Sequence, residues 1–412
     1  MFTEKITPRL LVETFGSPLY VYSERIFREK CHAMLAFCPY RPFAVNYAIK
    51  ANSNLSLLQI AREEGLRADV SSPGEALAAL AAGFPPQDVF FIVNNAAPQE
   101  LTFAIEKGLP VSVDSLSQLE TYGRLLGAGH PRRDICVRFN TGIGAGHHKK
   151  VVTGGDDTKF GIVPKDIPRV KALLATYNLR LAGINHHIGS QYAQEMYIVG
   201  AKALIDIARQ FEGLDFLDFG GGFYIPYHKE EGERPFDLQP VGAELARLMQ
   251  DFCATYGRPL TCMIEPGRFI AAECGVLLGT VHAVKQIGAN HYAGSDIGFS
   301  VLARPTLYDA HHDIQVFPLE GIAATAPPRI ANIVGNQCES GDYIAKNRAL
   351  PPLSEGDIIA VQDAGAYGYS MASQYNMRPR QAEVLITQGG ETRLIRRRDT
   401  PEDMLKNMQF PI

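Results

Sequence analysis

The chain has 412 residues, of which 46% are hydrophobic and 20% are charged. These proportions are ordinary for a globular protein with a filled core, so they exclude a mostly disordered chain, a collagen and a coiled coil. At roughly 150 residues per domain, the length predicts two or three domains, or one large barrel with a smaller partner. The formal net charge of -4 argues against the basic surface that binds nucleic acid.

Apolar stretches, the N-terminus and the cysteines indicate the cellular compartment of the protein. No stretch approaches the roughly 18 apolar residues that cross a bilayer, and the N-terminus lacks the basic-then-apolar layout of a secretory signal. The seven cysteines are an odd number without a close Cys-x-x-Cys pair, which indicates free thiols rather than a disulfide or zinc framework. We therefore expect a cytoplasmic protein with no membrane contact.

Eight short β-rich runs follow one another in the first two thirds of the chain. Their apolar character is typical of strands buried on both faces, as parallel sheets require. The runs are FAVNYAI from Phe43, RADV from Arg67, VFFIV from Val89, PVSVD from Pro110, ICVRF from Ile135, LAGINHHI from Leu181, FLDFG from Phe216 and TCMIE from Thr261.

Helix-like segments separate these runs, and several end at a glycine that would stop a helix. The clearest run from Ser53 to Gly65 and from Ser115, a predicted N-cap, to Gly127. Alternating β and α segments predict parallel strands with crossover helices. Eight such units over roughly 240 residues favour a (β/α)8 barrel, which needs about 250, over residues 36–275. A doubly wound open sheet is the alternative.

The sequence pattern changes after about Cys274, where Gly, Pro and short β-rich runs replace the helical periodicity of the preceding residues. This pattern predicts a C-terminal antiparallel β-barrel or sandwich domain over residues 276–412. The first 35 residues contain the strand-like run PLYVYSE, which lies outside the barrel count. We expect residues 1–35 to join the C-terminal domain.

Candidate chemistry lies where the predicted strands end, because barrels of this type carry function at the carboxyl ends of their strands. Lys50 follows the first strand. A lysine desolvated on one side at a barrel mouth has a lowered pKa, which favours the free amine that forms Schiff bases. A surface lysine that begins a loop is the alternative interpretation of this position.

Later strand ends supply an anion cradle and a carboxylate. Gly220–Gly222 follow the seventh strand, and successive glycines let backbone N–H groups converge on a phosphate. Ser190 follows the sixth strand, and Glu265 follows the eighth. Together with Lys50 these residues favour a phosphorylated, aldehyde-bearing cofactor, pyridoxal phosphate.

Six motifs then carry a resemblance to a known family. They are YAIKAN, HIGSQ, GGGF, EPGR, CESGD and the GAYGYSMASQYNMRP stretch from Gly365, in this order between about Ser17 and Thr400. In combination they resemble the ornithine, diaminopimelate and arginine decarboxylase family, and the diaminopimelate decarboxylases in particular. Members of this class join an alanine racemase-like barrel to a β domain and use pyridoxal phosphate.

The resemblance implies roles for single residues. Lys50 matches the Schiff-base lysine, His187 the histidine that stacks on the cofactor ring, and Glu265 the partner of the pyridine nitrogen. Positions near the cofactor match Asp69, Ser72, Ser190, Gly221, Gly222, Gly267, Arg268 and Tyr367.

Other matched positions concern the substrate. The resemblance implies substrate contacts for Arg268, Arg304, Tyr308, Glu339 and Tyr367. Cys338 matches the proton donor, which this family supplies, together with Glu339, from the other subunit of a homodimer. Arginines that grip a distal carboxylate and a glutamate that pairs with a distal ammonium favour meso-diaminopimelate, which decarboxylates to L-lysine with release of CO2.

The chain departs from the family pattern around the expected substrate pocket. Asn336-Gln337 replace Pro-Leu before the CESGD cysteine, Ser300-Val301 replace Asn-Asp, and His311-His312 replace Tyr-His. A related decarboxylase of another diamino acid, or of a siderophore, antibiotic or polyamine intermediate, is therefore an alternative. An amino-acid racemase and a cofactor carrier without catalysis are two more. The histidine pairs lack the helical spacing of a zinc site, so we expect no metal.

Overall fold

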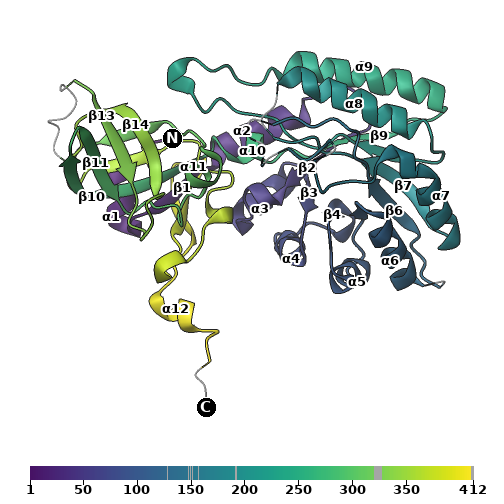
Figure 1. Ribbon diagram of the computed structural model, residues 1–412, viewed down its shortest axis with the longest axis horizontal. Coiled ribbons are helices and arrows are strands. Elements are labelled where there is room, and N and C mark those ends of the chain that lie inside the picture. The colour runs from purple at the N-terminus through teal and green to yellow at the C-terminus, as the bar shows by residue number, and fades with distance from the viewer. Residues whose placement is uncertain are drawn as a thin grey trace. The chain divides into compact units, whose positions relative to one another are not determined.

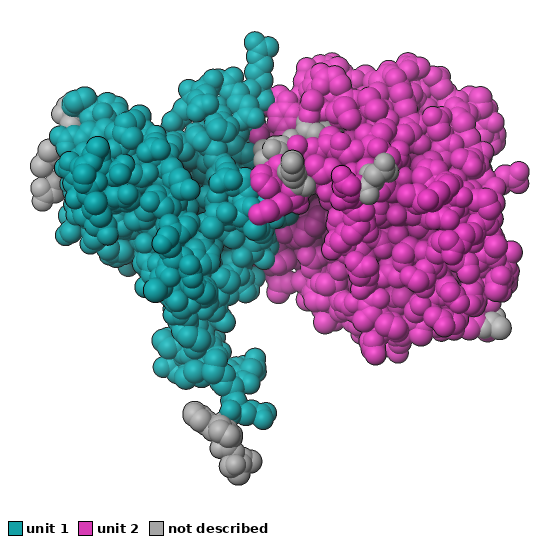
Figure 2. Space-filling model, in the orientation of Figure 1, with its two compact units in different colours: residues 1–27, 226–234, 271–412 teal, residues 28–225, 235–270 magenta. Residues whose placement is uncertain are grey.

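The computed structural model describes residues 1–127, 129–146, 148, 150, 152–155, 157–190, 193–319 and 327–409. The chain forms two compact units, shown in different colours in Figure 2. The barrel unit comprises residues 28–225 and 235–270, and the sheet unit comprises residues 1–27, 226–234 and 271–412. Each unit is described by itself.

Eight parallel strands close into a barrel in the barrel unit (Figure 1). Closure comes from the pairing of the first and last strands, in which Phe43 lies opposite Cys262. All eight predicted strands are confirmed, and the open-sheet alternative is wrong. The strands are β2 (Phe43–Ala48), β3 (Arg67–Val70), β4 (Val89–Ile92), β5 (Val111–Val113), β6 (Asp134–Arg138), β7 (Arg180–Asn185), β8 (Phe216–Asp218) and β9 (Thr261–Ile264).

Helices connect these strands and end where the sequence predicted. Ser115 caps α6 by accepting a hydrogen bond from the Gln118 N–H at 3.2 Å, and Gly127 ends it with φ of 63°, a left-handed value that glycine adopts without strain. The helices that lie wholly or mostly in this unit are α2 (Glu24–Leu35), α3 (Leu55–Glu63), α4 (Pro73–Ala81), α5 (Pro98–Glu106), α6 (Leu116–Leu126), α7 (Ile167–Thr176), α8 (Gln194–Ala208), α9 (Leu238–Tyr256) and α10 (Arg268–Ala271).

A nine-stranded sheet forms the sheet unit, with main order β14-β13-β11-β10-β1-β16-β17 and with β15 pairing both β10 and β12. As expected, β1 from the N-terminal run belongs to it. The strands are β1 (Leu19–Ser23), β10 (Gly275–Ile287), β11 (Asn290–Ser295), β12 (Ile314–Phe317), β13 (Arg329–Val334), β14 (Tyr343–Leu350), β15 (Ile358–Val361), β16 (Ala382–Ile386) and β17 (Thr392–Arg396), with helices α1 (Pro8–Phe15), α11 (Arg304–Tyr308) and α12 (Pro401–Leu405).

Two pairings in this sheet are parallel, β1 with β16 and β11 with β13, so the sheet is mixed rather than purely antiparallel. The β1–β16 pair joins segments at opposite ends of the chain, and local sequence patterns carry no information on such a pairing. Buried aliphatic side chains from β1, β10 and β16, among them Leu19, Leu278 and Val384, form its core.

The structure also bears on the predicted free thiols and on the expected lack of a membrane-spanning segment. All seven cysteines are free, six of them buried and Cys338 exposed. Among the described residues, every helix is too short or too polar to cross a bilayer.

Candidate active site

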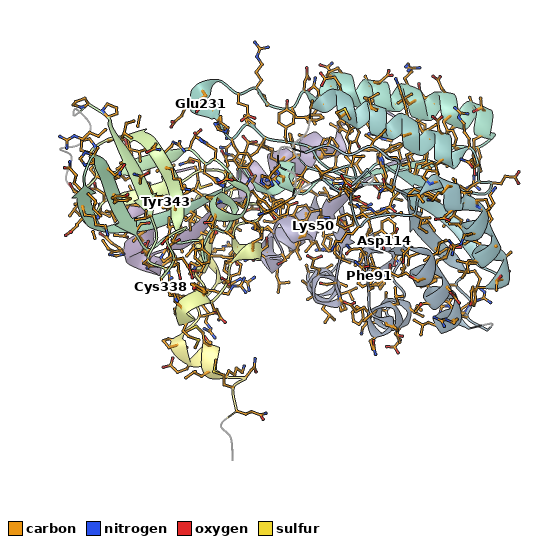
Figure 3. The ribbon with its side chains drawn as sticks, viewed as in Figure 1. Lys50, Phe91, Asp114, Glu231, Cys338 and Tyr343 are labelled. Atoms are coloured by element: carbon orange, nitrogen blue, oxygen red, sulfur yellow. The ribbon has the colours of Figure 1, made fainter. Side chains whose placement is uncertain are left out.

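Lys50 and Asp69 lie together at the carboxyl end of the barrel. Lys50 belongs to the 3-10 turn Ile49–Ala51 that follows β2 (Figure 3). Its Nζ lies 3.3 Å from Oδ2 of Asp69, on the neighbouring strand β3. Asp69 is 2% exposed, and its other oxygen, Oδ1, has no hydrogen-bond partner among the residues that the structure describes. The pair therefore leaves one buried carboxylate oxygen unsatisfied.

Glu265 follows β9, the strand on the other side of β2. Its side chain is buried, and its Oε1 makes no hydrogen bond to any described residue. Burial raises the pKa of Glu265 well above its ordinary value, and nearby Asp218 and Asp69 act in the same direction, whereas Lys50 lowers it. A cationic N–H group placed beside Oε1 would satisfy this oxygen and restore the charged carboxylate.

His187 follows β7 and joins the same group of residues. Its Nδ1 accepts a hydrogen bond from the Gly221 N–H at 3.1 Å. Burial lowers the pKa of His187 well below its ordinary value, and the positive charges of Lys50 and Arg138 lower it further. The imidazole is therefore neutral, which suits a ring that stacks on an aromatic cofactor.

The Gly220–Gly222 turn follows β8. Gly220 has φ of 67° and Gly222 of 102°, and a Cβ on Gly221 would collide with the backbone carbonyl of Glu265, so this turn requires glycine. The Gly220 N–H donates to Asp218 Oδ1 at 3.0 Å, and the Gly221 N–H to His187. Two of the three N–H groups of the turn thus already donate to protein side chains, so fewer N–H groups remain to bind an anion than the run of three glycines suggests.

The EPGR segment packs against the turn that carries Lys50. A Cβ on Gly267 would lie 3.1 Å from the side chains of Ala48 and Ala51. Arg268, at the start of α10, is buried and donates from Nη2 to Ser190 Oγ at 3.1 Å. Ser190 and the EPGR segment therefore contact each other, while Gln191 of the HIGSQ motif lies outside the described residues.

Ser72 has a local structural role. It is the N-cap of α4, and its Oγ accepts a hydrogen bond from the Glu75 N–H at 3.2 Å. This bond satisfies one of the N–H groups that a helix start leaves without an intrahelical partner.

Three charged residues at the same strand ends were not singled out as site residues from the sequence. Arg138 ends β6, and its Nη2 lies 3.4 Å from the His187 carbonyl oxygen. Asp114 follows β5 and is buried. Asp218 ends β8 and is fully buried, and this burial raises its pKa to about 7. The rule that found Lys50, the residue at each strand end, would have found all three.

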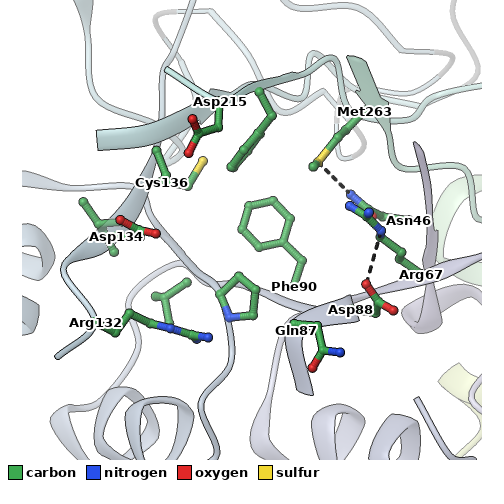
Figure 4. Close-up of a pocket in the computed structure, with 15 residues that line it drawn as sticks. Asn46, Arg67, Gln87, Asp88, Phe90, Arg132, Asp134, Cys136, Asp215 and Met263 are labelled. Atoms are coloured by element: carbon green, nitrogen blue, oxygen red, sulfur yellow. Dashed lines mark hydrogen bonds and ion pairs between the residues drawn. The ribbon is translucent and has the colours of Figure 1, made fainter. Parts of the chain in front are cut away.

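A cavity of about 250 Å³ lies at the opposite, amino-terminal ends of the strands (Figure 4). Phe90 and Phe216 pack edge to face in it, with ring centroids 5.7 Å apart. Its rim includes the ion pair between Arg67 and Asp88, at 3.3 Å. None of the predicted site residues lines this cavity.

Arg304 and Tyr308, the expected substrate contacts in the sheet unit, begin and end the short helix α11. Arg304 is 1% exposed and donates from Nη1 to His312 Nε2 at 2.6 Å. Its guanidinium carbon lies 4.4 Å from the ring centroid of Tyr227, so a cation–π contact and a hydrogen bond orient it. His312 Nδ1 lies 2.7 Å from the Gln362 carbonyl oxygen, which identifies Nδ1 as the protonated nitrogen.

Cys338 and Glu339 follow β13 and are exposed. The Cys338 N–H donates to Asn376 Oδ1 at 2.9 Å, and the Tyr375 hydroxyl donates to the Glu339 carboxylate. Tyr367 has φ of 57°, a left-handed value that costs free energy in a residue other than glycine. Strain of this kind is typical of positions held for function.

Two of the departures from the family pattern contact each other. Gln337 donates from Nε2 to Ser300 Oγ at 2.7 Å, and its N–H donates to Asp342 Oδ2 at 2.8 Å. The two substitutions therefore form one interaction in the sheet unit.

The residues at the barrel mouth fit pyridoxal phosphate. An amine is present on Lys50, a buried carboxyl oxygen without a partner on Glu265, a neutral imidazole on His187, and a hydroxyl and a guanidinium on Ser190 and Arg268. These groups correspond to the aldehyde, the pyridine nitrogen, the ring face and the phosphate of this cofactor.

The chain is similar to proteins of known function. Residues 24–272 match the family model described as pyridoxal-dependent decarboxylase, pyridoxal binding domain. The chain is 39% identical over 413 residues to the diaminopimelate decarboxylase of Methanothermobacter thermautotrophicus, covering 97% of this chain and 94% of that protein. It is 35% identical over 407 residues to the diaminopimelate decarboxylase of Escherichia coli K12, covering 95% and 93%.

Solved structures agree with these relatives. The crystal structure of diaminopimelate decarboxylase from Helicobacter pylori complexed with L-lysine superposes with a TM-score of 0.89 at 30% identity, covering 97% of this chain and 98% of that chain. The likeness therefore spans both units. The chain belongs to the pyridoxal-dependent decarboxylase family, among its diaminopimelate decarboxylases, and is a pyridoxal phosphate-dependent carboxy-lyase.

Proposed function

We propose that the protein decarboxylates meso-diaminopimelate to L-lysine with release of CO2. The observation that carries the reaction is the pair of unsatisfied carboxylate oxygens, Asp69 Oδ1 and Glu265 Oε1, on either side of the Lys50 turn. The substrate is supported by relatives that are named for it and by the lysine complex of the Helicobacter pylori protein.

The barrel residues would hold the cofactor as follows. The Lys50 amine binds its aldehyde carbon, and the Glu265 carboxylate accepts a hydrogen bond from the pyridinium nitrogen. His187 packs against the ring, with Asp69 near Lys50. Beyond these, Tyr367 of the sheet unit is a further cofactor contact, and Ser190, Gly221, Gly222, Gly267 and Arg268 surround the phosphate.

When bound, pyridoxal phosphate supplies an electron-withdrawing ring that stabilises a carbanion. The bond between Cα and the carboxylate carbon breaks, CO2 leaves, and the electron pair stays at Cα. Glu265 favours this step because its negative charge keeps the ring nitrogen protonated. The Cys338 thiol then donates its proton to Cα and is reprotonated by solvent.

Substrate selection would depend on residues of the sheet unit together with Arg268. The family resemblance assigns the distal carboxylate to Arg304 and Arg268, and it assigns further substrate contacts to Tyr308 and Tyr367. Glu339 pairs with the distal ammonium group. A buried guanidinium held in place by His312 and Tyr227 recognises a carboxylate in two hydrogen bonds, which an ammonium group cannot accept.

We propose further that the protein acts as a homodimer in the cytoplasm. Cys338 and Glu339 are exposed on their own chain, which suits residues that complete the active site of a partner subunit. Seven free cysteines suit a reducing compartment.

A decarboxylation panel tests the substrate. We expect CO2 release from meso-diaminopimelate and from none of L- and D-lysine, L- and D-ornithine and a carboxylated polyamine, with L-lysine as the product in chiral chromatography. Arg304→Lys should raise KM for meso-diaminopimelate by about tenfold to a hundredfold, because a bidentate charged contact is lost. Arg329→Lys, at the exposed first residue of β13, is the matched control and should leave KM unchanged.

The alternatives give different outcomes in the same panel. Turnover of lysine or ornithine would point to a related decarboxylase with another substrate. Inversion at Cα without CO2 would indicate a racemase. No reaction with any substrate would favour a cofactor carrier.

A further inference from the structure

Two histidines and a glutamate of the sheet unit lie together without any assigned role. They are His228, Glu231 and His311, and one donor atom from each lies within 4.8 Å of the others. None of them belongs to the residues proposed above to bind cofactor or substrate. We call this group the His228 site; Glu231 is labelled in Figure 3.

Local geometry brings His228 and Glu231 side by side. His228 caps the 3-10 turn Lys229–Glu231, and residues three apart eclipse one another in such a turn. His228 Nδ1 lies 3.3 Å from Glu231 Oε2, close enough for an ion pair if the imidazole is protonated, but this buried nitrogen has no hydrogen-bond partner among the described residues. Lys229 anchors the turn through ion pairs with Asp363 at 2.8 Å and Glu273 at 3.0 Å.

His311 reaches the same place from the segment between α11 and β12. Its ring stacks on that of His228, with centroids 3.9 Å apart and an interplanar angle of 28°. Because the two rings come from segments about 80 residues apart in the chain, only the tertiary fold brings them together.

A buried carboxylate fixes the orientation of His311. Its Nε2 lies 2.8 Å from Oδ1 of Asp313, which is 6% exposed. Nε2 therefore carries the proton, and Nδ1 presents its lone pair. A metal-binding histidine usually donates the N–H of its other ring nitrogen to a carboxylate in this way. The contact at Nδ1 is a long one, 3.3 Å from Nη1 of Arg348, which an ion would displace.

From this arrangement we propose that His228, Glu231 and His311 bind one divalent transition-metal ion, with Zn²⁺ as the reference. Two imidazole nitrogens and one carboxylate oxygen suit Zn²⁺, Co²⁺ or Ni²⁺, whereas Mg²⁺ and Ca²⁺ prefer oxygen ligands alone. The three ligands leave one coordination position open. His228 and His311 also line a cavity of about 390 Å³, which gives that position room for water or a small anion.

Binding requires a small rearrangement. Ligand atoms around a tetrahedral zinc ion are about 3.3 Å apart. The three donor atoms must therefore move closer together, and the stacked imidazole rings must rotate. His228 and Glu231 have side-chain exposures of 43% and 70% and are free to rotate, whereas Asp313 keeps His311 in place. The ion would therefore draw two surface side chains onto one fixed ligand.

Zinc titration of the holoenzyme after removal of any affinity tag tests the proposal. Calorimetry should show one Zn²⁺ per chain, and X-ray absorption at the zinc edge should show two imidazoles and no sulfur ligand. His228→Ala, His311→Ala and Glu231→Gln should each weaken binding tenfold or more, and Asp313→Asn about tenfold. Glu230→Gln, the adjacent exposed glutamate, is the matched control and should bind Zn²⁺ as the wild type does.

Some outcomes would overturn the site. Absence of stoichiometric zinc, a sulfur ligand from the exposed Cys338, or wild-type affinity in both His228→Ala and Glu231→Gln would each exclude it. Glu231→Gln changes one exposed atom and does not threaten folding, so a negative result with this variant remains interpretable.

Discussion

The two ends of the barrel both carry charged residues, but they differ in how these residues are satisfied. At the carboxyl end, Asp69, Glu265 and His186 are 2%, 5% and 3% exposed, and each has a side-chain atom without a hydrogen-bond partner in the described part of the chain. Buried polar atoms of this kind are rare in proteins and cost free energy unless a ligand satisfies them. The unsatisfied polar atoms therefore indicate that the carboxyl end of the barrel is a ligand-binding site.

The amino-terminal end shows the opposite condition. Arg180 pairs with Asp134 and with Asp215, each at 2.6 Å, and Arg258 pairs with Asp215 at 2.6 Å. These side chains are between about a third and a half exposed and satisfy one another. In barrels of this type the amino-terminal face serves stability. The two ends therefore differ in whether their charged groups have hydrogen-bond or ion-pair partners, and not in whether charged groups are present.

The largest effect on activity is expected from Lys50→Ala, at the carboxyl end of the barrel, where buried polar atoms lack partners. Turnover should fall by about a thousandfold or more, because the covalent attachment of the cofactor is lost. The visible absorption band of bound pyridoxal phosphate should disappear, while circular dichroism should stay unchanged, since the Lys50 side chain is 41% exposed. Lys165→Ala, an exposed lysine of the same unit, is the control; equal turnover in the two variants would refute the assignment.

The same variant tests the proposed dimer. Mixing Lys50→Ala with Cys338→Ser, after dissociation and reassembly, should restore activity up to about a quarter of the wild-type value, because half of the dimers would hold one intact site. Mixed dimers would gain nothing if Cys338 served the active site of its own chain.

Sequence patterns predicted the barrel end well, for a physical reason. Parallel strands buried on both faces are apolar runs, and their ends mark the barrel mouth, so Lys50, His187 and Glu265 could be located in advance. Arg138 and Asp218 were missed as site residues, although the same pattern marks their positions.

Other features could not be predicted, since they depend on contacts between distant segments. The partner of β1 is β16, more than 350 residues away in the chain. His311 meets His228 only in the folded sheet unit. The unsatisfied oxygens of Asp69 and Glu265 are likewise visible only when burial and hydrogen bonds are known.

A smaller effect is expected on the free energy of unfolding, which should depend on pH through His186 at the carboxyl end of the barrel. Burial lowers the pKa of His186 to about 3, and the positive charge of Arg138 contributes. Below the unfolded value of about 6.5 the unfolded chain binds a proton that the folded chain does not, so stability falls on acidification by about 1.4 kcal/mol per pH unit. Between about pH 6.5 and about pH 5 the cost is about 2 kcal/mol.

His186→Asn should remove this contribution. Urea unfolding of the variant and the wild type at several pH values should show a shallower loss of stability for the variant below about pH 6.5, whatever its stability at neutral pH. Parallel curves for the two proteins would show that His186 is protonated in the folded state.

The smallest effect is expected at the satisfied end. Arg180→Ala removes two ion pairs whose partners are 47% and 38% exposed. Exposed pairs contribute about 1 kcal/mol or less each, and salt screens them. The urea midpoint should therefore fall slightly at low salt and recover toward the wild-type value at high salt, while turnover stays unchanged. A loss of turnover would mean that the amino-terminal end takes part in the reaction, and the distinction between satisfied and unsatisfied charges would then fail to locate the active site.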